Sequence, residues 1–456
     1  MSEQSFDVVV VGAGPAGEVA AGRLAENGVS VAIVEPELVG GECSFFACMP
    51  SKALLRPAEA LAEARRVPGA AEAATGELDV PVALARRDEV IHDLDDSGAV
   101  PWLEDKGIAL FRAHGQLDGE RRVVAGDDVL TAERAVIVAT GSGALIPPIE
   151  GLRESKPWTN REITTAKEVP QRLAILGGGV VGSEMAQAWR SLGSQVTLIE
   201  AIDRLIGREE PFASEELAES LRELGVDVRL GSKATRVSRD GEVVVELEDG
   251  PEVRADELVV CIGRRPHTDR LGVETVGLEP GKPIDVDDRM RATGVDGDWL
   301  YAVGDVNNRA LLTHMGKYQA RAAADVILGK EARVTEDGAV SPRVIFTEPQ
   351  VAAVGHTLQS AQDAGMNVRA VDQGTSLNAG GSFYGRNSRG TTRLVIDEDR
   401  RVVVGATFVG AEVADFVHAA TIAVVGQVPL DRLWHAVPSF PTRSEVWLNL
   451  LEEYGL

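Results

Sequence analysis

Short apolar runs that end in a glycine turn are the clearest pattern along the chain. Residues 7–11 form such a run before the turn Gly-Ala-Gly-Pro-Ala-Gly at 12–17, and the Ala-rich residues 18–27 predict a helix. Residues 29–34 predict a second buried strand, which Glu35 closes. Strand, glycine turn, helix, strand and acid in this order are typical of a dinucleotide-binding unit.

Each glycine of this turn has a physical role in binding a dinucleotide. Gly12 permits the tight turn, Gly14 lets the backbone approach a pyrophosphate, and Gly17 packs the helix on the strand. The carboxylate of Glu35 would accept hydrogen bonds from the adenosine ribose hydroxyls. The whole arrangement, rather than the glycines alone, predicts a dinucleotide site.

The same arrangement recurs downstream. Residues 173–176 and 195–199 predict strands, and between them a helix to residue 192 follows the glycines Gly177, Gly179 and Gly182. The interval from the last glycine to the acid Glu200 equals that in the first copy, so a second dinucleotide is expected. A carboxylate there suits a free ribose 2′-hydroxyl, which predicts NAD rather than NADP, although Arg204 lies nearby.

Further apolar runs place additional strands around these two units. Residues 135–139 predict a strand that ends at Thr140 and Gly141, residues 259–262 a strand before Gly263, and residues 299–303 a strand before Asp305. A carboxylate at the carboxyl end of a strand can reach a ligand at the switch point of the sheet. Residues 147–151 are Pro-rich and predict a linker, and Cys261 is expected to be part of the core.

The pattern changes beyond residue 341. Residues 344–346, 391–396 and 401–409 predict strands, with a hairpin turn at 397–400, and residues 412–425 and 444–453 predict helices. This region has no glycine-rich phosphate turn. We therefore expect it to contribute an interface and part of a site.

Composition narrows the class of protein. A chain of 456 residues with 44% hydrophobic and 26% charged residues is typical of a soluble globular protein of two to four domains. A net charge of −25 argues against nucleic acid or an anionic membrane as a partner. No apolar run reaches the length of a membrane span, and the polar, acidic N-terminus is unlike a secretory signal, so a cytoplasmic location is expected.

The candidate chemistry lies in the sequence Gly-Gly-Glu-Cys-Ser-Phe-Phe-Ala-Cys-Met-Pro-Ser-Lys at 40–52. Two of the three cysteines, Cys43 and Cys48, occur there just before a predicted helix, whose N-terminus would stabilise a thiolate. A close cysteine pair in a reducing compartment is more often catalytic or metal-binding than structural. Zinc is not expected because no further cysteine or histidine pair supplies ligands. On spacing alone, two ordinary buried cysteines are an equal alternative.

The first glycine turn, Glu35, the Cys-x4-Cys-x3-Lys segment, the second glycine turn, Asp305 and the C-terminal region follow one another in this order. This arrangement resembles the pyridine nucleotide–disulfide oxidoreductases over nearly the whole chain. The resemblance implies an α/β fold with two Rossmann-like dinucleotide-binding domains plus an α+β C-terminal dimerisation domain. It implies FAD-binding segments at 1–150 and 281–340, an NAD(P)-binding domain at 151–280, a dimerisation domain at 341–456, and a homodimer.

The resemblance also assigns roles to individual residues. Those implied to contact FAD are Gly12, Gly14, Gly17, Glu35, Gly115 on the adenine side, Thr140, Gly141, Asp305 on the ribityl chain, and His314 with Met315 at the pyrimidine end. Those implied to contact the nicotinamide nucleotide are Gly177, Gly179, Gly182, Glu200 and Gly263.

The implied catalytic residues surround the flavin. Lys52 would lie near flavin N5, paired with Glu184, because a cation stabilises the reduced flavin and a carboxylate holds the lysine in place. NADH would reduce the flavin, which would then reduce a Cys43–Cys48 disulfide. Cys48 would be the sulfur near the ring, and Cys43 the sulfur offered to an acceptor.

The pattern departs from the family near the C-terminus. The family motif is His-Pro-Thr-x-Ser-Glu, whereas residues 440–445 are Phe-Pro-Thr-Arg-Ser-Glu, so Phe440 replaces the histidine and Glu445 is kept. Phenylalanine cannot transfer a proton, and losing a general acid–base group costs about 10²–10⁴ in rate. His435 is either a replacement or an exposed histidine.

The acceptor therefore stays open among small molecules. Phe45, Phe46 and Phe440 could form an aromatic wall that suits a planar or apolar acceptor, with core packing as the alternative for Phe45 and Phe46. The leading hypothesis is an FAD-dependent NADH oxidoreductase whose redox disulfide reduces an unusual disulfide, a quinone-like molecule or a metal ion. The alternatives are direct electron transfer from flavin to a quinone, dye or metal with non-catalytic cysteines, and a redox-sensing flavoprotein without significant turnover.

Overall fold

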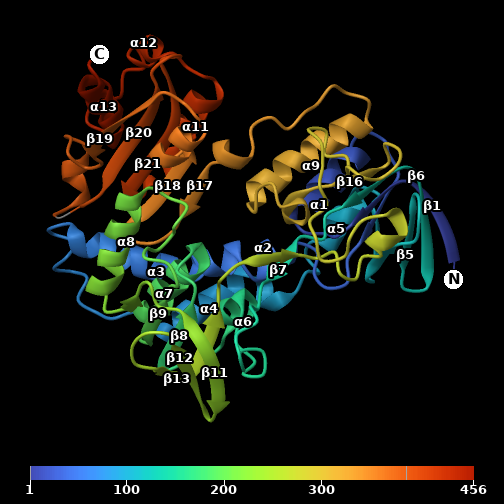
Figure 1. The fold of residues 1–456 in the computed structure, drawn as a ribbon, viewed down its shortest axis with the longest axis horizontal. Helices are drawn as coiled ribbons and strands as arrows, with labels where there is room; N and C mark the ends of the chain where they lie inside the picture. Colours follow the sequence, from blue (N-terminus) through green and yellow to red (C-terminus); the bar gives the residue numbers. More distant parts are fainter. Residues whose placement is uncertain (1, 387) are drawn as a thin grey trace. The chain divides into compact units, whose positions relative to one another are not determined.

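The chain forms two compact units in the computed structural model, which describes residues 2–386 and 388–456 (Figure 1). The first unit contains the residues up to 50, with 88–145 and 263–338, and the second contains 51–87, 146–262 and 339–456. The helices α3 (Cys48–Arg66) and α4 (Val80–Val90) each run from one unit into the other.

A seven-stranded sheet organises the first unit, with the order β3-β2-β1-β6-β5-β4 and β16 paired with β6. β6 pairs antiparallel with β5 through residues 128–131 and parallel with β16 through residues 136–138. The strands are β1 (Ser2–Val11), β2 (Val31–Val34), β3 (Ala109–Phe111), β4 (Gly115–Leu117), β5 (Arg122–Ala125), β6 (Asp128–Val138) and β16 (Leu300–Ala302). A separate two-stranded ladder joins β7 (Ser142–Ala144) and β15 (Arg264–Pro266).

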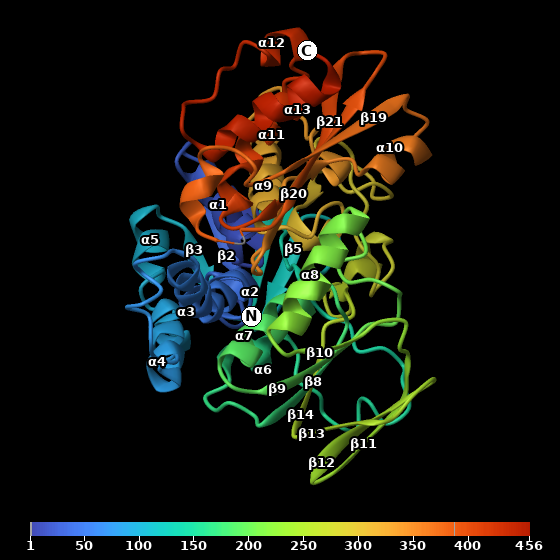
Figure 2. The same ribbon diagram turned by 90° about the vertical axis from the view of Figure 1, so that its left-hand side faces the viewer.

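Two Ala-rich helices of this unit, α1 (Pro15–Ala25) and α9 (Thr313–Ile327), pack against each other (Figures 1 and 2). Their small side chains, among them Ala20 and Ala323, are fully buried and permit the close approach. The shorter helices are α2 (Gly41–Phe45), α5 (Val100–Asp105) and the 3₁₀ turns η1 (His92–Leu94), η2 (Val273–Val276) and η3 (Gly304–Asn307).

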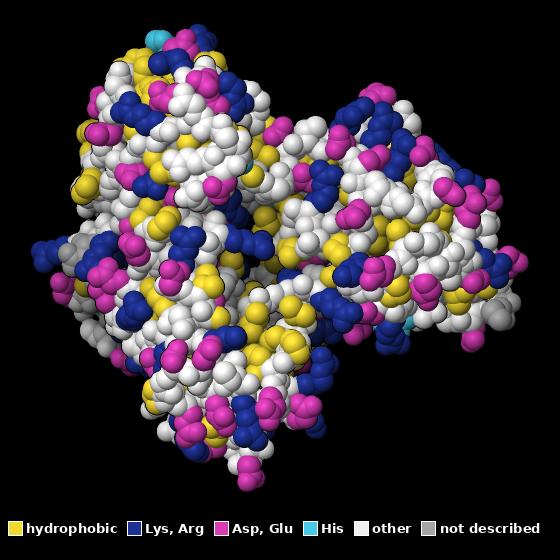
Figure 3. All heavy atoms as spheres, viewed as in Figure 1, with side chains coloured by type: hydrophobic (Ala, Val, Ile, Leu, Met, Phe, Trp, Pro, Cys, Tyr) yellow, Lys and Arg dark blue, Asp and Glu magenta, His cyan; other side chains and the backbone are white. Residues whose placement is uncertain are grey.

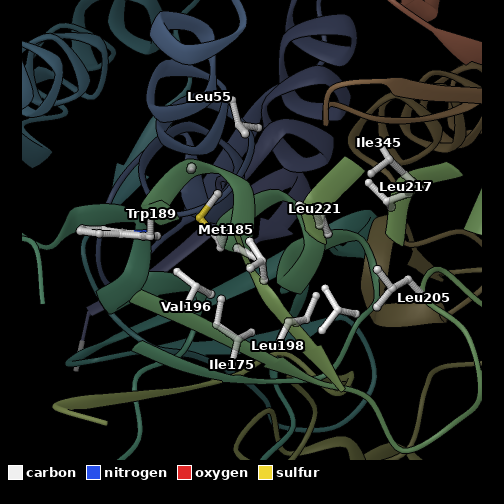
Figure 4. Close-up of a cluster of buried hydrophobic side chains, with 14 of the residues drawn as sticks. Leu55, Ile175, Met185, Trp189, Val196, Leu198, Leu205, Leu217, Leu221 and Ile345 are labelled. Atoms are coloured by element: carbon white, nitrogen blue, oxygen red, sulfur yellow. The ribbon is translucent and has the colours of Figure 1, made fainter. Parts of the chain in front are cut away.

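The second unit begins with a four-stranded parallel sheet of order β10-β9-β8-β14. Its main core includes Met185, Trp189, Leu198 and Leu217, from this sheet and two helices (Figure 4). The strands are β8 (Arg172–Leu176), β9 (Gln195–Ile199), β10 (Asp227–Arg229) and β14 (Glu257–Val260), and the helices are α6 (Asn160–Thr165), α7 (Val180–Ser191) and α8 (Pro211–Glu223). A small antiparallel sheet follows, formed by β11 (Ala234–Asp240), β12 (Glu242–Leu247) and β13 (Val253–Ala255).

The C-terminal part of this unit is an antiparallel sheet of order β17-β18-β21-β20-β19. α11 packs on β21 and β18, and α13 packs on β19 and β20 (Figure 2). The strands are β17 (Arg343–Ile345), β18 (Gln350–Gly355), β19 (Val368–Gly374), β20 (Thr391–Asp397) and β21 (Val402–Gly410). The helices are α10 (Leu358–Asp363), α11 (Val417–Val425), α12 (Leu430–Leu433), α13 (Val446–Tyr454) and the 3₁₀ turns η4 (Gly338–Val340), η5 (Gly381–Tyr384), η6 (Val413–Asp415) and η7 (Arg443–Glu445).

Several of the expected boundaries are wrong, and two of them concern a change of conformation or of burial. The helix expected over 412–425 starts only at Val417, because Glu412 adopts a left-handed φ of 52° and residues 413–415 form η6. The strand expected over 259–262 stops at Val260, so that Ile262 is exposed and Cys261 is partly buried against the core. Burial nevertheless raises the pKa of Cys261 to about 12.

Across residues 2–386 and 388–456, none of the helices combines the length and the apolar character needed to cross a bilayer.

Candidate active site

The first glycine turn leaves one open face. Gly12 has a φ of 105°, and a Cβ there would lie 2.4 Å from the carbonyl oxygen of Ala139. A Cβ on Gly17 would lie 1.9 Å from the carbonyl oxygen of Gly12, so both positions require glycine for close packing. A Cβ on Gly14 meets no atom within 4 Å. That free space at the start of α1 fits the pyrophosphate of a dinucleotide.

The second glycine turn, in the other unit, has the same geometry. Gly177 has a φ of 106°, and a Cβ on Gly182 would lie 1.8 Å from the carbonyl oxygen of Gly177. A Cβ on Gly179 again meets no atom within 4 Å. The residues present at both turns therefore fit a bound dinucleotide.

The acid that follows each turn, Glu35 or Glu200, forms a hydrogen bond with the backbone of that turn. Both oxygens of the Glu35 carboxylate, and both of the Glu200 carboxylate, accept hydrogen bonds from backbone N–H groups. The donors are Ala13 and Glu37 for Glu35 (2.9 Å each), and Gly178 (2.6 Å) and Ile202 (3.0 Å) for Glu200. Burial raises the pKa of Glu35, and its backbone hydrogen bonds act in the opposite direction. Each acid thus holds the second residue of its turn and keeps lone pairs for a ribose.

The cysteine segment lies against the first glycine turn. Gly40 and Gly41 have φ values of 113° and 58°, which favour glycine. The N–H of Gly40 donates to the carbonyl oxygen of Ala13 at 2.8 Å. A Cβ on Gly41 would lie 2.8 Å from Cα of Gly14. The backbone before the cysteines therefore contacts the proposed pyrophosphate turn directly.

The two thiols lie together beside a threonine. Cys43 is in α2, Cys48 begins α3, and Sγ of Cys48 lies 3.4 Å from Oγ1 of Thr313, the first residue of α9. A hydrogen bond with Cys48, followed by burial and the charge of Cys48, raises the pKa of Cys43. A hydrogen bond from Thr313 and the positive charge of Lys317 act in the opposite direction. The reactivity of Cys43 therefore depends on α9 as well as on Cys48.

Asp305 is held by a hydrogen-bond network of the first unit. Its carboxylate accepts from the Ser142 hydroxyl at 2.6 Å and lies 3.3 Å from Nε of Arg264. Arg264 in turn donates to Oγ of Ser142 at 2.7 Å. The hydroxyl of the neighbouring Thr140 donates to the carbonyl oxygen of His267 at 3.0 Å. These bonds fix the loop ends from which Asp305 and Thr140 are predicted to contact FAD.

Lys52 and Glu184 form an ion pair in the second unit. Nζ of Lys52 lies 2.7 Å from Oε2 of Glu184, whose side chain is only 3% exposed. The other carboxylate oxygen accepts from the backbone N–H of Phe346 at 2.9 Å, and the ring of Phe346 lies 4.6 Å from the ammonium. The lysine is thus held by a carboxylate and by an aromatic face.

The remaining residues predicted to contact a cofactor differ in packing and in exposure. A Cβ on Gly115 would lie 2.7 Å from Cγ1 of Val11, so core packing already requires glycine there. Gly263 has only ordinary contacts, with Leu145. In the first turn of α9, His314 is exposed and Met315 is buried. Their predicted cofactor contacts stay predictions.

The C-terminal residues of the predicted site lie at the surface of the second unit. Phe440 is 77% exposed, and His435 is exposed as well. Within the described residues, Oε2 of Glu445 is buried without a hydrogen-bond partner. Phe45, in the first unit, is 4% exposed, which agrees with core packing rather than with a wall for an acceptor.

Four residues of these surroundings were not anticipated from the sequence. They are Thr313 beside the thiols, Ser142 and Arg264 beside Asp305, and Phe346 beside Lys52. Ser142 follows a predicted strand end and Arg264 follows Gly263, so their positions carried a weak signal. Nothing in the local sequence distinguishes Thr313 or Phe346, because each meets its partner only through the fold.

The chain is similar in sequence to known flavoenzymes. Residues 6–324 match the family model of pyridine nucleotide-disulphide oxidoreductases, and residues 341–451 match the dimerisation domain of that family. Dihydrolipoyl dehydrogenase of Haloferax volcanii is 31% identical over 98% of this chain and 95% of its own length. Mercuric reductase of Staphylococcus aureus is 29% identical over 96% of this chain and 81% of its own length.

A solved structure of a flavoprotein reductase has a similar fold. The HOCl-induced flavoprotein disulfide reductase RclA from Escherichia coli superposes with a TM-score of 0.85 at 25% identity, over 98% of this chain and 99% of that one. Two dinucleotide turns, a cysteine pair and a separate antiparallel domain define a flavin- and nicotinamide-dependent reductase. The chain belongs to the pyridine nucleotide–disulfide oxidoreductase family. It is therefore an FAD-dependent NAD(P)H oxidoreductase with the fold expected from the sequence, and its dimerisation domain supports a homodimer.

Proposed function

We propose that the enzyme uses NADH to reduce the Cys43–Cys48 pair, and that the pair reduces an acceptor other than an ordinary thiol disulfide. When bound, FAD supplies the step between the two-electron nicotinamide donor and the sulfur pair. The observation that carries the proposal is the contact between the cysteine segment and the first glycine turn, through Gly40 and Gly41. This contact supports a position for the thiols beside the cofactor.

The chain's own residues would bind and orient the reactants. Gly14 and Glu35 would hold the ADP half of FAD, and Asp305 its ribityl chain. Lys52, held by Glu184, would place a positive charge where the reduced cofactor becomes negative. Cys48 would face the cofactor, and Cys43 would meet the acceptor.

The preference for NADH rests on Glu200 and its surroundings. Glu200 directly follows β9, and its carboxylate lies beside the second glycine turn, where it would repel a 2′-phosphate. The nearby Arg204 could neutralise this effect, but its guanidinium donates to the carbonyl oxygen of Gly207 at 2.6 Å. This bond orients the guanidinium, and the preference for NADH rests on the Glu200 carboxylate alone.

The nature of the acceptor follows from Phe440. This side chain cannot protonate a leaving thiolate, so an ordinary disulfide would be reduced about 10²–10⁴ times more slowly. A quinone-like molecule or a metal ion does not require that proton donor at the exposed sulfur. The exposed aromatic ring also suits a planar, apolar acceptor. The same ring favours a second candidate function, direct electron transfer from the flavin to a quinone.

An anaerobic titration of the FAD-loaded enzyme with NADH tests the proposal. We expect four electrons per subunit, two in the flavin and two in the sulfur pair, with a long-wavelength thiolate–flavin absorption band that appears with the first two electrons and is lost with the next two. Cys43→Ser should accept only two electrons, whereas the control Cys261→Ser should still accept four. Uptake of two electrons by the unaltered enzyme would contradict the proposal and favour direct transfer to the acceptor.

A further inference from the structure

We propose that Thr313 is a catalytic residue whose hydroxyl donates a hydrogen bond to whichever cysteine sulfur carries negative charge after reduction. The inference rests on the proposed function of Cys43 and Cys48 as the redox pair. It gives the enzyme, within one subunit, a device that stabilises a thiolate without a histidine.

The position of the hydroxyl carries this inference. Oγ1 of Thr313 lies 3.4 Å from Sγ of Cys48, and Thr313 also hydrogen-bonds Cys43. All three residues belong to the first unit, on α9, α3 and α2. Leu312, rather than Thr313, is the N-cap residue of α9, so the hydroxyl does not act as the cap of its own helix.

The chemistry of the reduced pair fixes the direction of the hydrogen bond. Reduction of the disulfide by two electrons, which the nicotinamide nucleotide would supply, breaks the S–S bond, and uptake of one proton leaves one thiol and one thiolate. A thiolate can only accept hydrogen bonds, so Thr313 must then be the donor. Because a hydroxyl has one proton, it donates to one sulfur at a time. Rotation of the side chain would transfer the bond from Cys48 to Cys43.

A second group on the same helix adds positive charge. Lys317 lies one turn beyond Thr313 on α9, and its charge favours the thiolate of Cys43. Glu18 of α1 also interacts with Lys317, so the lysine faces both an acid and the thiols. The charge of Lys317 thus acts on Cys43 from the same helix that carries Thr313.

Alkylation of the reduced enzyme tests the role of Thr313. The FAD-loaded protein is reduced with dithiothreitol, freed of it anaerobically, and treated with iodoacetamide over a range of pH, and each modified cysteine is identified by mass spectrometry. Thr313→Val and Thr313→Ala remove the hydroxyl, and Thr313→Ser keeps it. Thr275→Val is the matched control, because its hydroxyl contacts the backbone rather than a sulfur: it donates to the carbonyl oxygens of Leu117 and Gly272 and accepts from the N–H of Gly119.

We expect the alkylation midpoint of Thr313→Val and Thr313→Ala to rise by about one pH unit, a tenfold change in the thiolate equilibrium. Alkylation below the midpoint should slow by about threefold, and above both midpoints it should become faster, because a more basic thiolate is a better nucleophile. Thr313→Ser and Thr275→Val should match the unaltered enzyme. Structural damage alone would not produce rates that cross with pH.

Two results would overturn the inference. One is an unchanged midpoint in both Thr313→Val and Thr313→Ala, and the other is a Thr313→Ser enzyme that behaves like Thr313→Val. Because dithiothreitol reduces the thiols without NADH, these results are independent of nucleotide-driven turnover. Failure of NADH to reduce a normally reactive thiol pair would instead contradict the proposed function.

Discussion

The Glu184 carboxylate has two separable contacts at the residue scale. One oxygen pairs with Lys52, and the other accepts the N–H of Phe346. Lys52 is partly exposed and can be solvated when its partner loses charge, whereas a buried N–H without an acceptor keeps its full desolvation cost. The two contacts should therefore contribute differently to stability.

Substitution of Glu184 should show this difference. Glu184→Gln keeps an acceptor for the N–H and should lower the free energy of unfolding by about 1 kcal/mol. Glu184→Leu removes both contacts and should cost about 1–3 kcal/mol more. Thermal unfolding followed by tryptophan fluorescence measures both. Glu223→Gln, which changes an exposed ion pair with Arg389, is the control and should have little effect. Equal stability of the two Glu184 variants would contradict this account.

The roles of individual residues could be predicted only where the residues occupy fixed positions in a sequence motif. Lys52 and Glu184 could be paired in advance because each occupies a family position, and the ion pair is present. The roles of Thr313 and Phe346 could not be predicted. The contacts of the Thr313 hydroxyl with sulfur and of the Phe346 ring with the Lys52 ammonium leave no periodic or compositional signal in the sequence. Their contacts join segments that are far apart in the sequence.

At the scale of elements, the glycines within each turn should differ in whether they tolerate a side chain. Gly14 and Gly179 have φ values of −71° and −73°, which alanine adopts without strain, and each has open space around it. An added methyl group would leave the fold intact but occupy the place of a pyrophosphate. Gly17 differs, because a Cβ there collides with the backbone of its own turn.

Alanine at each open position should therefore separate the two cofactors. Gly14→Ala should fold but lose FAD affinity by at least about tenfold, equivalent to about 1.4 kcal/mol. Gly179→Ala should keep its FAD, remain reducible by dithionite, and raise KM for NADH by a similar factor. Flavin content and steady-state kinetics measure both effects, with Gly17→Ala as the variant expected not to fold. A Gly14→Ala enzyme that purifies with full FAD would contradict the assignment.

The limits of helices and strands could be predicted only in part from the pattern of apolar residues. The strand at 195–199 was predicted with its correct limits, because its buried apolar residues Val196, Leu198 and Ile199 lie just before the acid Glu200. β1 begins well before the predicted run, since residues 2–5 pair with β6 but are exposed and carry no apolar signal. β6 also begins earlier than predicted, at Asp128. The late start of α11 depends on one left-handed residue, Glu412, which no periodicity reveals.

At the scale of the whole molecule, surface charge and apolar exposure have different distributions. Acidic and basic side chains are interspersed over the face drawn in Figure 3, despite the net charge of −25. In the C-terminal part of the second unit, large apolar side chains away from the predicted site are exposed at Ile422, Val425 and Val437. This part matches the family's dimerisation domain, so we expect these side chains to be covered in the dimer.

The dimer gives Phe440 its predicted effect on specificity. If Phe440 of one subunit lies near the cysteines of the other, Phe440→His should restore a proton donor and raise NADH-dependent reduction of lipoamide by about 10²-fold or more. Phe383→His, at another exposed phenylalanine of the same unit, is the matched control and should not raise it. Equal rates for the two variants, in dimers of equal stability, would show that a missing base does not limit disulfide reduction.

The close approach of Gly41 to Gly14 links sulfur chemistry to cofactor occupancy. A ligand that orders the glycine turn also orders the backbone leading to Cys43, since the two segments touch without an intervening side chain. Loss of FAD would therefore remove both the electron source and the support of the cysteine loop. Enzyme without FAD should thus expose its cysteine segment to proteases and bulky thiol reagents, so the flavin also protects the protein against damage at its most reactive residues.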